Sequence, residues 1–345
     1  MNEMQTILDA SVTKLLDDHS TKQAIQGAEE GGWPEALWNA LVENGMTRIL
    51  LPEAQEGAGA TWSDAHVVIK AAGAHAAPVP LAEAILAGFV LGRAGITMPE
   101  GIVTVMEGDF KLNGGRLTGT AKRVPWGRNA SHAVTLVESG WGVEAVLAPL
   151  EYARLEKDQN VAREPRDTLV FDNIVVDTAW AGLPGNALRL YGALMRATQM
   201  AGALDYLTRQ SVQYANERTQ FGKPIGKFQA IQQQLAVLST QSAAVGIASA
   251  HAAQRADKVT SGDAAAFEIA VAKTRADDAT SIATSIAHQV HGAIGFTYEH
   301  GLHFATRRLW SWRAEFGSGA EWADWLGRET IARGADALWP YVTAR

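Results

Sequence analysis

The chain has 345 residues, of which 47% are hydrophobic and 19% are charged, and this is more sequence than one hydrophobic core usually organises. Its 37 acidic and 30 basic residues give a net charge of −7, and no run of Lys and Arg is longer than Arg307-Arg308. We therefore expect neither nucleic acid nor a membrane surface as a partner. The sequence contains no cysteine, which excludes disulfides, thiol catalysis and thiolate metal sites.

The first hundred residues predict a helical domain, with bounds 1–100. Apolar residues recur at three- and four-residue steps after Pro34 and after Pro80, and proline suits the first turn of a helix. Met1–Ile25 mixes charges with leucines and lacks the apolar block of a signal peptide, so we expect a cytoplasmic location.

Residues 101–183 predict a β domain. Asn113-Gly114 separates two alternating segments and indicates a hairpin, because Asn-Gly accepts positive φ at both turn positions. Val143–Leu147 and Thr168–Val176 are further strand-like runs.

Residues 184–345 predict an up-down bundle of four helices. Four stretches almost free of proline carry the helical period: Leu188–Glu217, Phe228–Lys258, Asp263–Val290 and Ser318–Arg333. The second stretch is uncharged as far as Gln254, but its many glutamines favour a buried helix of a soluble protein over a membrane span. So long an uncharged face also predicts a dimer or larger assembly.

Two loops of this C-terminal region carry the chemical signal. Arg218–Gln229 combines a cation, amides, aromatic rings and glycines, and Arg218 could bind a pyrophosphate through two charge-assisted hydrogen bonds. Gln289–His300 offers donors and acceptors beside glycines that allow close backbone approach. This combination suits a flavin dinucleotide better than a metal or a nucleophile.

Together with Leu51-Pro52-Glu53 and Gly119–Val134, the two loops closely resemble the acyl-CoA dehydrogenase family over nearly the whole chain. The resemblance implies a mostly α fold with an N-terminal helical domain, a β-barrel-like middle domain and a C-terminal four-helix bundle. It also implies FAD bound across a subunit boundary. The residues that it nominates for FAD are Arg218, Gln220, Phe221, Ile225, Phe228, Gln229, Gln289, His291, Gly292, Ala293 and Trp126. Ala293 departs from the family's second glycine.

The family's proton-abstracting glutamate precedes a glycine in the loop after the second motif, and the position in register here is Phe316. Some relatives carry the base on the first bundle helix, where this chain has Leu190–Ala193 and no carboxylate. Glu315 is the catalytic candidate, although adjacent side chains of an extended segment point to opposite faces. Glu299 and Glu321 are more distant candidates.

The resemblance implies an FAD-dependent acyl-CoA dehydrogenase, or one subunit of such an enzyme. It would desaturate an acyl-CoA thioester between the α and β carbons and pass the electrons to an electron-transfer flavoprotein. The short chain, an unrecognisable flavin loop near Gly101–Gly108 and the displaced base are similar to the smaller subunits of paired dehydrogenases that act on bulky thioesters, such as steroid side chains.

Two alternatives remain open. One is a catalytically incomplete partner that completes the flavin site of a sister chain, and the other is a flavin monooxygenase or oxidase on the same scaffold. In each case we expect a homo-oligomer or a hetero-oligomer with a related subunit.

Overall fold

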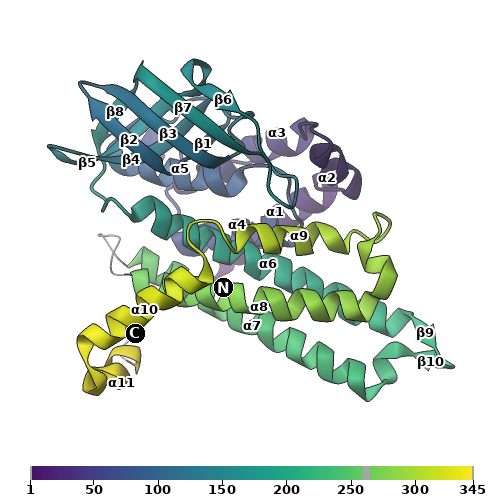
Figure 1. The fold of residues 1–345 in the computed structure, drawn as a ribbon. Helices are drawn as coiled ribbons and strands as arrows, with labels where there is room; N and C mark the ends of the chain where they lie inside the picture. The colour runs from purple at the N-terminus through teal and green to yellow at the C-terminus, as the bar shows by residue number, and fades with distance from the viewer. Residues whose placement is uncertain (1, 259–264, 344–345) are drawn as a thin grey trace.

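The structure is a computed structural model that describes residues 2–258 and 265–343. A group of N-terminal helices, two β-sheets and a group of long C-terminal helices follow one another along the chain (Figure 1). The N-terminal helices are α1 (Glu3–His19), α2 (Lys22–Glu29), α3 (Glu35–Glu43), α4 (Trp62–Ala74) and α5 (Leu81–Ala94). Asn2 and Thr61 begin α1 and α4 with capping boxes, in which each side chain accepts a hydrogen bond from the first turn.

Eight strands form two four-stranded sheets in the middle of the described chain, and these sheets do not close into a barrel. The strands are β1 (Val103–Val105), β2 (Gly108–Asn113), β3 (Arg116–Pro125), β4 (His132–Ser139), β5 (Gly142–Pro149), β6 (Arg154–Glu156), β7 (Arg166–Val175) and β8 (Asp177–Trp180). One sheet has the order β1-β4-β5-β8, with β1 parallel to β4, and the other has the antiparallel order β2-β3-β7-β6.

The predicted hairpin is β2–β3, but its turn lies one residue later than expected. Asn113 pairs with Arg116, so Gly114 and Gly115 form the turn, with φ of +54° and +71°. Two glycines accept positive φ at lower cost than Asn-Gly, which explains the shift.

The C-terminal helices are α6 (Ala187–Glu217), α7 (Gln229–Asp257), α8 (Ala266–His291), α9 (Leu302–Trp312), α10 (Gly319–Arg333) and α11 (Ala335–Thr343). The predicted helical C-terminal region is confirmed: α6, α7 and α8 pack on one another, and α10 packs on α8. The sequence did not predict α9, which packs on α6. Residues 263–264 of the third predicted stretch lie outside the described residues. Because α6 also contacts α4, it connects the two helical groups.

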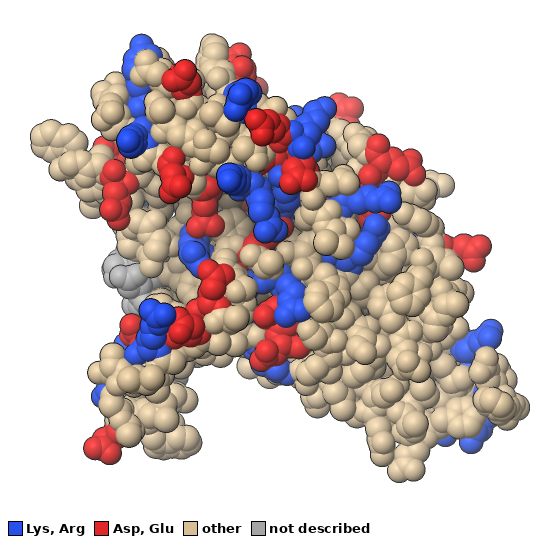
Figure 2. Space-filling model, in the orientation of Figure 1, with Lys and Arg blue, Asp and Glu red and all other residues tan. Residues whose placement is uncertain are grey.

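Helix α7 is not buried all round, contrary to the expectation from its sequence. Leu238 and Val245 on one face are fully buried, whereas Val237 is 44% and Ile247 is 72% exposed on the other. The face of the molecule over α7 and α8 carries almost no charge (Figure 2). No helix within the described residues is long and apolar enough to cross a membrane.

Candidate functional site

A short hairpin after α6 carries the first predicted motif. Its strands β9 (Thr219–Gln220) and β10 (Lys223–Pro224) pair antiparallel, and Phe221 stands in the turn with φ +51°. The Phe221 side chain is 91% exposed. A bulky residue at positive φ is strained, and an exposed ring buries no apolar surface, so both features indicate a contact that a ligand or another chain provides.

The backbone of Arg218 fixes this hairpin to α6. Its N–H donates to the Tyr214 carbonyl, and its carbonyl accepts from the N–H of Ile225, both at 2.8 Å. The Arg218 side chain is exposed and makes no hydrogen bond or ion pair within the described part of the chain. Its guanidinium is therefore free to bind an anion.

The aromatic rings of the motif lie together at the start of α7. Phe228, the residue before α7, meets Phe221 edge to face with ring centroids 6.2 Å apart, and Lys223 Nζ lies 4.4 Å from the Phe228 ring. Gln220 and Gln229 are exposed beside them, and Ile225 is half-buried. The first motif therefore presents amides, rings and cations on one surface.

The second predicted motif lies at the end of α8 and meets the first through Tyr214. The His291 ring stacks on the Tyr214 ring, with centroids 4.6 Å apart. Tyr214 is one helical turn before Arg218. The structure thus brings the two motifs together.

His291 offers one free acceptor at this junction. Burial lowers the pKa of His291, so its ring is neutral near pH 7. Nδ1 lies 2.7 Å from the Ala287 carbonyl and must donate there, which leaves Nε2 as an acceptor. Nε2 is buried and has no hydrogen-bond partner in the described residues. Buried polar atoms are normally paired, so Nε2 is a candidate acceptor for a ligand hydroxyl or N–H.

Gly292 follows His291 with φ +63° and ψ −145°, a conformation that residues with a Cβ rarely adopt. A Cβ built there meets no atom within 4 Å, so the backbone faces open space. Gln289 and Ala293 are exposed on either side. Free donors, a free acceptor and exposed backbone make a surface that fits a dinucleotide.

Phe316, which is in register with the family's base, touches the stretch Leu190–Ala193, where some relatives carry theirs. Phe316 follows α9 with φ +53°, and its ring packs against Gly192 of α6. An ideal Cβ at Gly192 would lie 2.3 Å from a ring carbon of Phe316. Neither residue can accept a proton.

Glu315 is buried between two arginines. Arg166 Nε donates to Glu315 Oε1 and Arg196 Nε donates to Oε2, each at 2.7 Å. Burial alone would raise the pKa of Glu315, but the two guanidinium groups outweigh it and hold that pKa at about 2. We infer that Glu315 is a structural anion and not the base, because so weak a base remains ionised and its oxygens are already bound.

Family models match both helical regions. The N-terminal domain of acyl-CoA dehydrogenases matches residues 2–98, and the C-terminal domain of the same enzymes matches residues 190–321. The chain belongs to the acyl-CoA dehydrogenase family.

Similar proteins span almost the whole chain. The acyl-CoA dehydrogenase IpdE2 of Mycolicibacterium smegmatis is 29% identical over 319 residues, which are 89% of this chain and 93% of that protein. A chain of the ChsE4–ChsE5 complex from Mycobacterium tuberculosis superposes with a TM-score of 0.87 at 22% identity and covers 97% of this chain and 99% of its own. PigA with FAD and proline gives 0.83 at 17%, with the same coverage. These structural likenesses show the fold.

Trp126 lies apart from the two motifs, in the β domain after β3. It is 4% exposed, and the ring of Trp33 meets it edge to face at 6.2 Å. Through this contact Trp126 packs the β domain against the N-terminal helical region, and its predicted place beside a flavin stays a prediction.

Glu321 and Glu299, the two more distant candidates for the base, lie outside the loop that carries Phe316. Glu321 forms a capping box with Ser318 at the start of α10, and hydrogen bonds from Ser318 and Arg189 lower its pKa to about 2. The exposed Glu299 lies in the loop before α9, where its carbonyl accepts from Lys22 Nζ at 2.8 Å. We infer that Glu321 serves as a helix cap and not as the base.

A cleft of about 940 Å³ adjoins the loop that carries Phe316. Arg189 and Trp322 line it, and both lie against Gly317. Arg255, Arg328 and Arg333 add positive charge, although each has an acidic neighbour.

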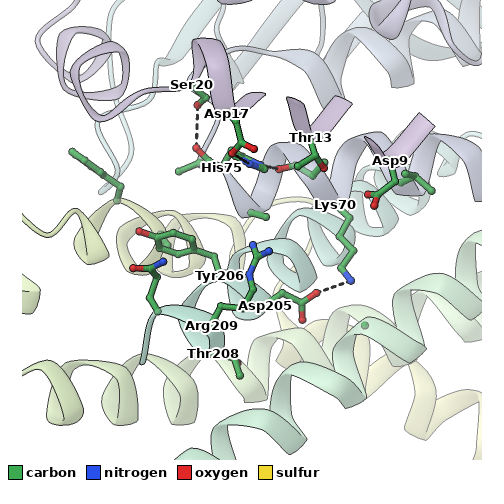
Figure 3. A pocket seen from close by; sticks show the side chains of 18 of the residues that line it. Asp9, Thr13, Asp17, Ser20, Lys70, His75, Asp205, Tyr206, Thr208 and Arg209 are labelled. Carbon is green, nitrogen blue, oxygen red and sulfur yellow. Dashed lines mark hydrogen bonds and ion pairs between the residues drawn. The ribbon is translucent and has the colours of Figure 1, made fainter. Parts of the chain in front are cut away.

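A larger hollow of about 1160 Å³ lies between α1, α4, α6 and α7 (Figure 3). Charges on its walls are largely paired, as in Lys70 with Asp205 at 2.6 Å and His75 with Asp17 at 3.1 Å. None of the predicted site residues lines it.

The sequence did not predict the roles of Arg166, Arg196 and Lys273. Arg196 lies in an otherwise apolar stretch of α6, and Lys273 is fully buried in α8. A charge on the apolar face of a helix is a signal that could have marked both, because such charges are buried only with partners.

Proposed function

We propose that this chain is one subunit of an FAD-dependent acyl-CoA dehydrogenase and that a sister chain supplies the proton-abstracting carboxylate. The observation that carries the proposal is the contact of Phe316 with Gly192. Phe316 stands in register with the family's base, the stretch Leu190–Ala193 has no carboxylate, and the neighbouring Glu315 is bound by two arginines.

The two motif loops are the flavin-binding surface of this proposal. Arg218 would neutralise the pyrophosphate, His291 Nε2 would accept from a hydroxyl or N–H, and Gly292 would let the backbone approach. Phe221 is exposed and strained, which supports a site completed by a second chain. The FAD complex of the similar fold PigA agrees with this choice of cofactor.

Desaturation removes a proton from the α-carbon and a hydride from the β-carbon of the thioester. FAD, when bound, supplies the hydride acceptor, and an electron-transfer flavoprotein would take the electrons. This chain holds the cofactor and excludes water with apolar side chains. The proton has no acceptor at Phe316 or Gly192, so it must pass to a group of the sister chain.

The cleft beside Gly317 is our candidate for the phosphate-bearing end of the acyl-CoA. Arg189 and Arg328 are partly exposed there, next to the rings of Trp322 and Trp325. Guanidinium groups bind phosphates, and indole rings offer a stacking face to an adenine.

The uncharged face of α7 and α8 is the proposed surface for the sister chain. Ile247 and Val237 are exposed on α7, whose sequence carries no Lys, Arg, Asp or Glu from Gln229 to Gln254. The similar fold in the ChsE4–ChsE5 complex comes from an assembly of two different chains, which supports a paired enzyme.

Purification of the chain from its native host tests the proposal. We expect a second, related chain to co-purify and the assembly to hold FAD that an acyl-CoA reduces. A homo-oligomer of this chain alone that desaturates acyl-CoA would overturn the divided site. Flavin that is reduced only by a nicotinamide cofactor and then reacts rapidly with oxygen would indicate the monooxygenase alternative.

A further inference from the structure

A network of buried charges connects the N-terminal helices, the β domain and the C-terminal helices. Its members, in the order in which each contacts the next, are Glu29, Arg308, Glu164, Arg166, Glu315, Arg196 and Glu83. Each side chain is at most 9% exposed. Arg307 also binds Glu29, so four arginines balance four glutamates and the network needs no further ion.

Glu315 lies at the centre of this network. Arg166 begins β7, Arg196 belongs to α6, and Glu315 joins them from the loop after α9. Arg196 also donates to Glu83 of α5 at 2.6 Å, and Arg166 donates to Glu164 at 2.9 Å. Because its partners are themselves fixed, Glu315 is held from two directions.

The ends of the same loop are held independently. Lys273 Nζ donates to the carbonyl of Arg313 at 2.6 Å and to that of Gly317 at 2.8 Å. Trp322 Nε1 donates to the Phe316 carbonyl at 3.0 Å. The loop from Arg313 to Gly317 is thus bound at both ends and in the middle.

Phe316 is the strained residue of this loop. A left-handed φ of +53° is costly for phenylalanine and persists only where the surroundings enforce it. Its ring fills the notch at Gly192, and the guanidinium carbon of Arg196, one helical turn further along α6, lies 5.6 Å from the ring centroid. Arg196 therefore binds both Glu315 and the ring that follows it.

The space around this notch is filled by other rings. Tyr191 stacks on Trp62 with centroids 4.9 Å apart, and Phe89 lies 4.8 Å from Tyr191. The Phe316 ring fills the notch at Gly192 itself, while the cleft beside Gly317 stays open next to Arg189 and Leu190.

We propose that Glu315 is a positioning residue that keeps Phe316 seated against Gly192, and that this seat closes the notch at Gly192 to an acyl chain. Without the two arginine contacts, the loop would be held by the backbone contacts of Lys273 and Trp322, and relief of the strain at Phe316 would open the notch. The role of Glu315 in holding Phe316 does not depend on the proposed function. Only the identification of the excluded ligand as an acyl chain rests on it.

Thiol labelling tests how firmly the loop holds position 316 at the notch, and the natural chain contains no cysteine that would interfere. In the full-length chain, Phe316→Cys places a single thiol at the notch, and its reaction with an aromatic disulfide reagent reports exposure of position 316. We expect slow labelling in this variant and labelling at least tenfold faster when Glu315→Gln is added. Ala283→Cys, at a fully buried position of α8, is the matched reporter, and its labelling should not change with Glu315→Gln.

The pair of reporters separates positioning from general stability. Equal labelling rates at position 316 with and without Glu315→Gln would overturn the proposal, and so would equal acceleration at both reporters, which indicates loosening of the whole fold. If the Glu315→Gln variant does not fold, Glu315→Asp replaces it in the test. Aspartate keeps the negative charge, but its side chain is one methylene shorter and reaches the two arginines less well. A smaller acceleration confined to position 316 is then expected, and its absence overturns the proposal. The readout needs neither flavin nor turnover, so its failure is distinct from a failure of the proposed function.

Discussion

The Phe316 ring occupies the place that a side chain at Gly192 would take, on a helix that is distant in sequence. The two residues therefore constrain each other. Gly192→Ala should destabilise the chain by about 1–3 kcal/mol, since an added methyl overpacks the contact. In a Phe316→Ala background the same substitution should be neutral or stabilising, because alanine favours helices over glycine by about 1 kcal/mol.

Urea unfolding of the four proteins in this double-mutant cycle measures the coupling. Gly327→Ala is the control, since Gly327 lies in α10 with no atom within 4 Å of an added Cβ, and this change should stabilise the chain. Additive effects at positions 192 and 316 would show that the ring does not fill the notch.

Arg218→Ala should weaken flavin binding about 10- to 100-fold, because a hydrogen bond to a charged group contributes about 1.5–3 kcal/mol. Arg209→Ala is the matched control, since Arg209 lies in α6, which ends just before Arg218, but lines the larger hollow. Flavin retained after gel filtration of each assembly gives the comparison. Equal flavin retention in both variants would show that Arg218 does not contribute to flavin binding.

Acid should weaken the contribution of Glu315 to stability. The folded-state pKa of about 2 lies below the ordinary value of 4.5, so the stabilisation is complete above about pH 5 and is lost as the pH falls toward 2. At pH 7, Glu315→Gln should cost about 3–5 kcal/mol, because it leaves buried guanidinium groups without their anion. Unfolding free energies of both proteins between pH 7 and pH 3 should converge, and a constant difference would contradict the ion pairs.

The exposed face of α7 should carry the contact between subunits. Ile247→Glu places a charge on an apolar surface and should shift the assembly toward monomers in sedimentation, with Val161→Glu, on an exposed loop, as the control. An unchanged sedimentation coefficient for Ile247→Glu would show that the subunits make contact through another surface.

The sequence predicted those parts of the fold that depend on local pattern. Periodicity located α6, α7 and α8, and alternation located β5 and β7. Helix α9 was missed because it is short and lies between glycine-containing loops. The β2–β3 turn lies one residue later than predicted, because Gly114 and Gly115 adopt the positive φ angles that were expected at Asn113 and Gly114.

In the candidate site, too, the sequence predicted what depends on contiguous residues and missed what depends on contacts between distant segments. The Arg218 and Gln289 motifs could be found because their residues are contiguous. The surroundings of Glu315 could not, because Arg166 and Arg196 come from distant segments and only the fold brings them to one carboxylate. The contact of Trp126 with Trp33 likewise joins segments that are distant in sequence.

Anaerobic reduction of the flavin by a panel of acyl-CoA thioesters is the most direct test of a divided site. We expect that FAD held by this chain alone keeps its absorbance, that the assembly with the sister chain bleaches, and that Glu315→Gln in a folded assembly leaves the bleaching rate within a few-fold of the wild type. Rapid bleaching by the chain alone, abolished by Glu315→Gln without loss of FAD, would contradict the divided site and would make Glu315 the base.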